Sequence, residues 1–162
     1  MSVCLIDTSI LCEFLQVPNL CESYAEVEAE MSRKIEGRES LLLPMSTLIE
    51  TGNHIGQNGD GRQRRSVAQR FVDLVQQAIR GETPFTPTPF FEPEVLLQWI
   101  GEFPDWAMRT DSKGRGSGLA DLTIAKEFER QCALHRMRRV YIWSSDAHLS
   151  SFDRAAQQRN TR

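Results

Sequence analysis

Long hydrophobic runs are missing from this chain, since none approaches the roughly 20 residues that a membrane-spanning helix needs. The opening residues, 1–6, also lack the basic region and the longer apolar stretch of a signal peptide. Both absences predict a cytoplasmic protein that makes no membrane contact. The length of 162 residues and the 40% hydrophobic, 25% charged composition predict one globular domain over residues 1–162, with a frayed helical tail from about 152 onward.

Cysteine and histidine, the common zinc ligands, are scarce at four and three residues. The cysteines show neither Cys-x-x-Cys spacing nor a nearby group of histidines, which favours buried reduced thiols over a zinc site. Glycine-rich motifs for mononucleotides and dinucleotides are missing as well. The Asp-x-Asp of haloacid-dehalogenase phosphatases is absent, because Asp7 is followed by Thr8 and Ser9. The acidic pair and phosphoacceptor aspartate of response regulators are not found either.

Lysine is also scarce: sixteen of the 19 basic residues are arginine. The planar guanidinium of arginine suits bidentate contacts with phosphate. The formal net charge of −3 argues against a protein that coats nucleic acid non-specifically. The charge is unevenly distributed: residues 13–36 hold six acids against two bases, and residues 130–162 hold seven arginines against two aspartates. Most of these arginines are interpreted as solvated helix faces, and any RNA contact is expected to come from local patches.

Short buried-looking runs alternate with amphipathic segments along the chain. Strands are expected at 3–6, 41–43 and 139–143, with an edge strand inside the proline-rich stretch 83–93. Helices are expected over 8–15, 19–35 with Asn19 as cap, 47–57 with Ser46 as cap, 62–80, 93–100 and 119–135. Loops are expected at 58–61 and 111–118. This alternation predicts an α/β protein with three α/β/α layers and a central, mainly parallel sheet.

Four acids accompany these buried elements. Asp7 directly follows the first strand and Asp146 follows the last one, while Glu50 lies near the second turn of an early helix and Asp121 opens a late helix. The carboxyl ends of parallel strands share one edge of the sheet, where open α/β folds place their sites. Carboxylates gathered there raise each other's pKa unless a cation lies among them. Hard oxygen ligands suit Mg²⁺ or Mn²⁺, so the pattern predicts a metal site.

Each acid also has an ordinary structural explanation. Asp7 and Asp146 could cap the helices or turns that follow them. Asp121 could interact with the dipole of its own helix, and Glu50 could be a solvated residue. His54, one helical turn after Glu50, is interpreted as a histidine satisfied by a neighbouring carboxylate.

Two serines accompany the acids at the strand ends. Ser9 and Ser144 are candidates either for orienting a carboxylate or a metal-bound water, or for capping the local backbone. Ser144 precedes Asp146 by two positions, so on a strand-like backbone both side chains are expected to point the same way.

The four acids and their neighbours resemble a known family. Asp7-Thr8-Ser9 near the N-terminus, Glu50 on an early helix, Asp121 at the start of a late helix and Ser144-Ser145-Asp146 after a late strand resemble the PIN-domain nucleases. Among these, the toxin ribonucleases of bacterial toxin–antitoxin pairs are the nearest in size and layout. The resemblance extends over essentially the whole chain.

The resemblance implies a PIN-like fold and a metal-dependent endoribonuclease that hydrolyses single-stranded RNA to 5′-phosphate and 3′-hydroxyl ends. It implies one or two Mg²⁺ or Mn²⁺ ions held by the four acids, and a catalytic group of Asp7, Glu50, Asp121, Asp146, Ser9 and Ser144. It also suggests an antitoxin protein as partner and allows a homodimer. The alternative from another class is a non-catalytic module that keeps the PIN fold while binding RNA or a protein.

Basic residues outside the acid group are the candidate contacts for RNA phosphates. They are Arg62, Arg64 and Arg65 on one helix, Lys113 and Arg115 in the glycine-rich loop before Asp121, and Arg136, Arg138 and Arg139 before the last strand.

Overall fold

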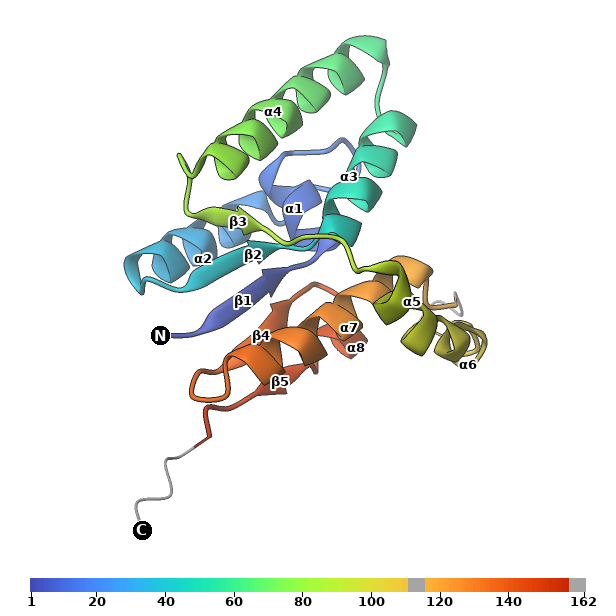
Figure 1. Cartoon of the computed structure of the whole chain (residues 1–162). Helices are drawn as coiled ribbons and strands as arrows, with labels where there is room; N and C mark the ends of the chain where they lie inside the picture. Colours follow the sequence, from blue (N-terminus) through green and yellow to red (C-terminus); the bar gives the residue numbers. More distant parts are fainter. Residues whose placement is uncertain (111–115, 158–162) are drawn as a thin grey trace.

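A five-stranded sheet forms the centre of the protein in a computed structural model that describes residues 1–110 and 116–157 (Figure 1). The strands are β1 (Val3–Ile6), β2 (Ser40–Leu43), β3 (Phe85–Pro87), β4 (Val140–Trp143) and β5 (Asp153–Arg154). Their order is β3-β2-β1-β4-β5; the first four are parallel, and β5 pairs antiparallel with β4. The predicted α/β class with a mainly parallel sheet is confirmed.

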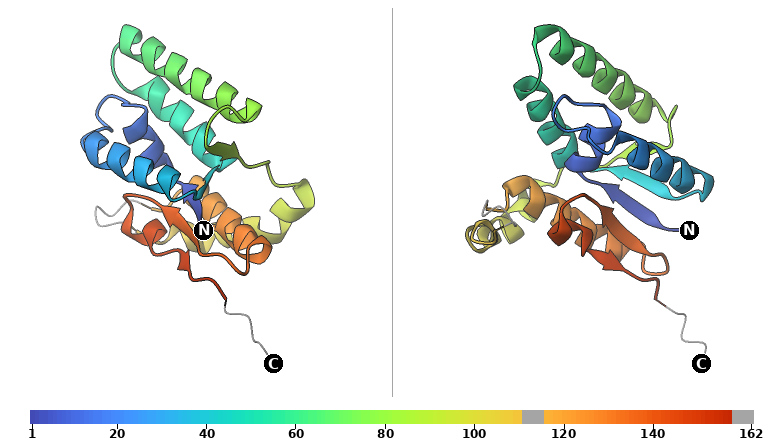
Figure 2. Two further views of the ribbon diagram at one scale, coloured as in Figure 1. Left: turned by 90° about the vertical axis from the view of Figure 1, so that its left-hand side faces the viewer. Right: turned by 180° about the vertical axis from the view of Figure 1, so that it is seen from behind.

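Helices cover both faces of this sheet. They are α1 (Thr8–Phe14), α2 (Tyr24–Glu36), α3 (Met45–Gln57), α4 (Gly61–Arg80), α5 (Pro93–Trp99), α6 (Phe103–Ala107), α7 (Leu119–Leu134) and α8 (Ala147–Ser150), with a 3₁₀ turn at Ile100–Glu102. In Figure 1, α7 lies in front of the sheet and α2 behind it; the view from behind in Figure 2 reverses the two. The arrangement is consistent with three α/β/α layers. None of the described helices is long and apolar enough to span a membrane.

The alternation of side chains along β1 divides the core into two parts. Cys4 and Ile6 belong to one hydrophobic cluster, which includes residues of α1 to α4. Val3 and Leu5 belong to the other cluster, together with Ile124 of α7. All four residues of β1 are fully buried, which explains why this strand has no polar position.

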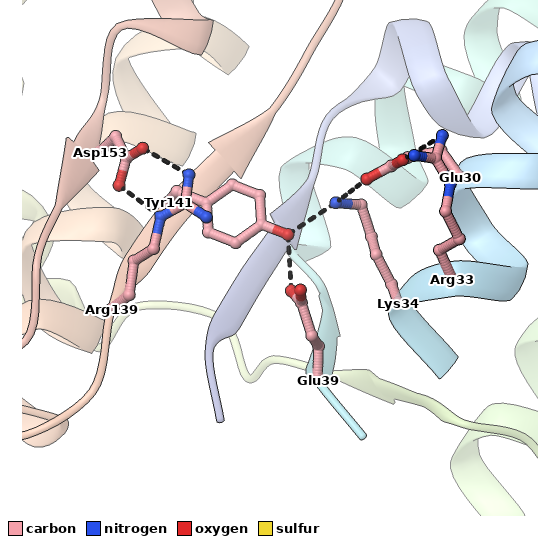
Figure 3. A network of polar contacts seen from close by, with 7 residues as sticks. All are labelled: Glu30, Arg33, Lys34, Glu39, Arg139, Tyr141 and Asp153. Atoms are coloured by element: carbon pink, nitrogen blue, oxygen red, sulfur yellow. Dashed lines mark hydrogen bonds and ion pairs between the residues drawn. The ribbon is translucent and has the colours of Figure 1, made fainter. Parts of the chain in front are cut away.

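A buried lysine joins α2 to the sheet (Figure 3). The Lys34 ammonium donates to the Tyr141 hydroxyl at 2.7 Å and lies 2.7 Å from a Glu30 carboxylate oxygen. It also lies 4.7 Å from the centroid of the Trp143 ring. The Tyr141 hydroxyl in turn donates to Glu39, and burial above all raises the pKa of this tyrosine. These partners offset the cost of burying a charge next to the end of β4.

Several predicted boundaries are wrong. Asn19 does not cap a helix: its φ is 65°, and α2 begins only at Tyr24. Ser46 is not the cap of α3, which already begins at Met45 after Pro44. The Ser46 hydroxyl is instead buried without a partner among the described residues.

Residues 152–157 do not form the expected short helix. Phe152 accepts a backbone hydrogen bond from Ile142, and β5 pairs along the free edge of β4. Pairing the free backbone N–H and C=O groups of that edge stabilises the chain more than a short polar helix would. The predicted tail extends beyond residue 157, outside the described part, as does most of the predicted loop 111–118.

All four cysteines are free thiols. Cys4 and Cys12 are buried as expected, and burial raises the pKa of each to about 12. Cys21 and Cys132 are partly exposed, so the prediction of buried thiols holds for only two of the four.

Candidate metal centre

The order of the strands changes direction between β1 and β4. From β1 the chain continues to β2 and β3 on one side, whereas β4 lies on the other side of β1. The Asp7 amide donates to the Trp143 carbonyl at 3.1 Å, which places the two strand ends side by side. Open α/β sheets bind ligands beyond the carboxyl ends of such neighbouring strands.

The helices bring the other two acids to the same edge. The chain enters α3 directly after β2, and the Thr47 hydroxyl donates to the Ile6 carbonyl at 3.0 Å, so the early turns of α3 lie at the end of β1. Glu50 lies in the next turn. Because α7 precedes the parallel strand β4, its first turn, with Asp121, starts at the carboxyl edge.

A cavity of about 890 Å³ opens at this edge, and all four acids line it. Asp7, Glu50, Asp121 and Asp146 therefore reach one space from four separate elements. Thr8, Ser9, His54, Arg109 and His148 are among the other lining residues. The structure thus brings the four acids together as the sequence analysis expected.

Asp7 is the most firmly held of the four. Only 6% of the residue is exposed, and one carboxylate oxygen, Oδ2, accepts hydrogen bonds from the hydroxyls of Ser9 (2.8 Å) and Ser144 (2.7 Å). The same oxygen caps α1 by accepting from the Ser9 amide at 3.3 Å. Capping and orientation toward the cavity are therefore combined in one residue, and both serines contact the carboxylate as proposed from the sequence.

Glu50 is positioned by a residue that the sequence analysis did not single out. The buried Thr8 hydroxyl donates to Glu50 Oε2 at 2.8 Å. Asp7-Thr8-Ser9 thus holds two of the acids, because Thr8 and Ser9 bond to different carboxylates. His54 also lines the cavity, but no hydrogen bond among the described residues joins its ring to Glu50. The neighbouring carboxylate expected to satisfy His54 is not found among the described residues.

Asp121 shows the electrostatic effect of the acid group. Burial raises the pKa of its carboxyl to about 6, against an ordinary value of 3.8. The Gly118 amide, which donates to Oδ2 at 2.8 Å, lowers the pKa, whereas the charges of Glu50, Asp7 and Asp146 raise it. The three other acids are thus close enough to disfavour the charged form of Asp121, a condition that a cation relieves.

Asp146 is the most exposed acid of the group. Its Oδ1 accepts from the backbone amides of His148 and Leu149, both at 2.9 Å, and so caps the short helix α8. The Asp146 amide donates to the Ser144 hydroxyl at 2.9 Å, and the same hydroxyl donates to Asp7. Ser144 consequently links the ends of β1 and β4.

One pattern is common to the four carboxylates. Each uses one oxygen for an internal hydrogen bond, and within the described residues no hydrogen bond reaches the other: Asp7 Oδ1, Glu50 Oε1, Asp121 Oδ1 and Asp146 Oδ2. This oxygen-only donor set suits Mg²⁺ or Mn²⁺. As the side chains stand, no three of the described His, Cys, Asp and Glu residues are close enough to hold one ion. Mg²⁺ commonly takes only one or two carboxylates directly and keeps several waters, so the donor set fits it.

The predicted RNA contacts divide into three groups. Arg62 and Arg65 line a groove of about 480 Å³ on α4 together with Arg70, whereas Arg64 donates to the Gly59 carbonyl at 2.7 Å. Lys113 and Arg115 lie outside the described residues.

The arginines before the last strand do not line the cavity. Arg138 donates to the carbonyls of Met1 and Ser2, and Arg139 forms a bidentate pair with Asp153. These contacts lie at the amino end of the sheet, because Arg139 precedes β4 and Ser2 precedes β1. Arg138 and Arg139 are thus engaged by the backbone and by Asp153 at the edge of the sheet opposite the acids, and their contact with RNA phosphates stays a prediction.

Arg109 and His148 also line the cavity, although no sequence pattern predicts them there. Arg109 follows α6 and belongs to no motif, and His148 has no metal-ligand spacing, so only the tertiary structure identifies them. Comparison with family models, with curated proteins and with solved structures finds no match.

Proposed function

We propose that this chain is a metal-dependent endoribonuclease with a PIN-like fold that hydrolyses phosphodiester bonds of single-stranded RNA. One observation carries the proposal: four acids from four elements line one cavity at the switch between β1 and β4. The raised pKa of Asp121 supports it, because a site of this kind is more stable with a cation among its carboxylates.

Four carboxylates of the chain would serve as the metal ligands. Asp7, Glu50, Asp121 and Asp146 would hold one or two Mg²⁺ or Mn²⁺ ions through their oxygens. A bound divalent ion would lower the pKa of a water molecule and offset the charge that develops around phosphorus.

The hydroxyls near the site give the carboxylates their orientation. Ser9 and Ser144 fix the Asp7 carboxylate plane, and Thr8 fixes that of Glu50. Such contacts leave the ligand oxygens little freedom to lose when a cation binds.

The proposal is tested with purified protein and a pool of cellular RNAs, followed by mapping of the new ends. Cleavage should require Mg²⁺ or Mn²⁺, stop in EDTA and yield 5′-phosphate ends. Full cleavage in excess chelator would contradict the metal mechanism. Binding of RNA without any cleavage would favour the alternative of a non-catalytic module.

Asp7→Asn is the decisive variant. Cleavage should be lost because a neutral amide is a weak ligand, while the melting temperature should change little, since Asn caps a helix about as well as Asp. Asp105→Asn on the exposed surface of α6 is the matched control and should cleave normally. Equal cleavage by both variants would refute the role of Asp7 as a ligand.

A further inference from the structure

The wall of the acid cavity also contains a positively charged residue, the one arginine or lysine of the described chain that lines it. Arg109 lines the same cavity as the four acids. No ion pair among the described residues joins its guanidinium to any of these acids. The cavity thus presents carboxylates on one part of its wall and an arginine on another.

An aromatic platform positions the Arg109 side chain. Its guanidinium carbon lies 4.4 Å from the centroid of the Trp106 ring, and one terminal nitrogen lies 3.5 Å from His148 Nε2. Trp106 is only 6% exposed and belongs to a cluster with Trp99, so the platform is anchored in the interior. Stacking of this kind restricts the guanidinium and lowers the entropy lost when it binds an anion.

The backbone near Arg109 is held as well. The Arg109 amide donates to the Trp106 carbonyl at 3.0 Å, and the Arg109 carbonyl accepts from the Ser117 amide at 2.9 Å. Ser117 directly precedes Gly118, whose amide holds Asp121. The arginine and one of the acids are therefore connected through two neighbouring residues.

From this arrangement we infer that Arg109 binds a backbone phosphate of the RNA and positions the strand against the acid group. The inference rests on the proposed function. A guanidinium presents paired donors that match two phosphate oxygens, and it keeps its charge at every physiological pH. An acid cavity repels the phosphates of its own substrate, so a fixed cation on its wall favours binding of the strand.

The test compares Arg109→Gln with Arg80→Gln, which removes the same charge from an exposed position at the end of α4 that lines neither cavity. The readouts are Mn²⁺ affinity, the KM and kcat for a mixed-sequence single-stranded RNA, and the salt dependence of RNA binding. RNA binding is measured in the Asp7→Asn background to prevent cleavage. Arg109→Lys serves as a further variant that keeps the charge but loses the paired donors.

Arg109→Gln should raise KM about tenfold, the order expected for one partly exposed charge-assisted contact. Its salt slope should fall by about 0.7, as for one lost phosphate contact on a single strand, with Mn²⁺ affinity unchanged. Arg109→Lys should keep the salt slope and show an intermediate KM. If Arg109→Gln melts at a lower temperature, the comparison with Arg109→Lys decides the test.

Normal KM and salt slope in both Arg109 variants, with the unsubstituted chain active, would overturn this inference alone. If the unsubstituted chain neither binds Mn²⁺ nor cleaves RNA, the proposed function itself is overturned and the inference falls with it.

Discussion

At the scale of single residues, the site depends on how each carboxylate divides its two oxygens. Asp7 and Asp146 each cap a helix with one oxygen, yet both line the cavity. Capping and metal binding were rival explanations of these acids in the sequence, but in the structure each capping carboxylate also lines the cavity, so the two explanations are compatible. A carboxylate that is already oriented by hydrogen bonds loses little freedom when a cation binds.

The protonation of Asp121 gives a prediction for the metal-free protein. Its folded-state pKa of about 6 lies above the ordinary 3.8, so the folded state holds the proton more tightly than the unfolded state. The stability that this proton contributes is complete below the ordinary value and is lost as the pH rises through about 6. The melting temperature of the metal-free protein should fall over this range, as measured by calorimetry.

Two controls separate this effect from general charge repulsion. Asp121→Asn should flatten the pH dependence over the same window, because the amide does not titrate. Mg²⁺ should raise the melting temperature more above this window than below it, since protons and the cation compete for the carboxylates. A Mg²⁺ effect that is independent of pH would contradict the assignment of Asp121 as a ligand.

At the scale of secondary-structure elements, the position of β4 relative to α2 depends on a buried charge. Lys34 connects α2 to Tyr141 in the middle of β4 and lies against Trp143 at its end. Ser144, the residue that holds Asp7, follows immediately. The network of Figure 3 therefore supports the strand end from which two site residues extend.

Lys34 and its neighbour Arg33 provide a matched pair for measuring this support. Both side chains pair with Glu30, but that of Lys34 is 7% exposed and that of Arg33 is 71% exposed. Lys34→Met should destabilise the fold by about 2 kcal/mol, because the buried Tyr141 and the partly exposed Glu30 lose a charged hydrogen-bond partner. Arg33→Met should cost less than about 1 kcal/mol, as for an exposed ion pair.

Urea unfolding of the two variants gives these free energies. Similar losses of stability would show that the burial of Lys34 does not make its charge important for the fold.

At the scale of the whole molecule, the groove on α4 that is lined by Arg62, Arg65 and Arg70 lies near the acid cavity. Arg70 of α4 donates to the Leu15 carbonyl, while Asn19 and Leu20, a few residues further, line the cavity. Gly59, with φ of 72°, lies so close to Pro18 that an added Cβ would be 2.9 Å from the proline ring. The segment 15–20 therefore lies between the cavity and α4.

This arrangement sharpens the prediction for the arginines of α4. Arg62 and Arg65 line the groove, whereas Arg64 is bonded to a backbone carbonyl. Replacing Arg62 and Arg65 with Gln should weaken RNA binding and reduce the salt slope by about 1.4, or about 0.7 for each phosphate contact. Arg64→Gln should have a smaller effect. Fluorescence anisotropy over a range of salt concentrations measures this, and equal slopes in all variants would exclude α4 from substrate binding.

The sequence by itself determined the class of fold and the positions of the four acids along it. The buried runs at β1, β2 and β4 are local signals, and acids that follow parallel strands or begin the adjoining helices must approach one edge of the sheet. No relation to a distant residue is needed for that conclusion. The sequence did not predict the helix start at Tyr24 or the strand β5. A left-handed backbone at Asn19 and an unpaired sheet edge override local preference there.

Only the tertiary structure decided which atoms face the cavity. Ser144 and Asp7 are 137 positions apart, and Thr8 and Glu50 are 42 apart, so their hydrogen bonds cannot be derived from local pattern. The same holds for Arg109, which lies beside the acids because Trp106 anchors it there. It also holds for the pKa of Asp121, which depends on burial and on three charges from other elements. Such properties arise from distances in space, and these exist only once the chain has folded.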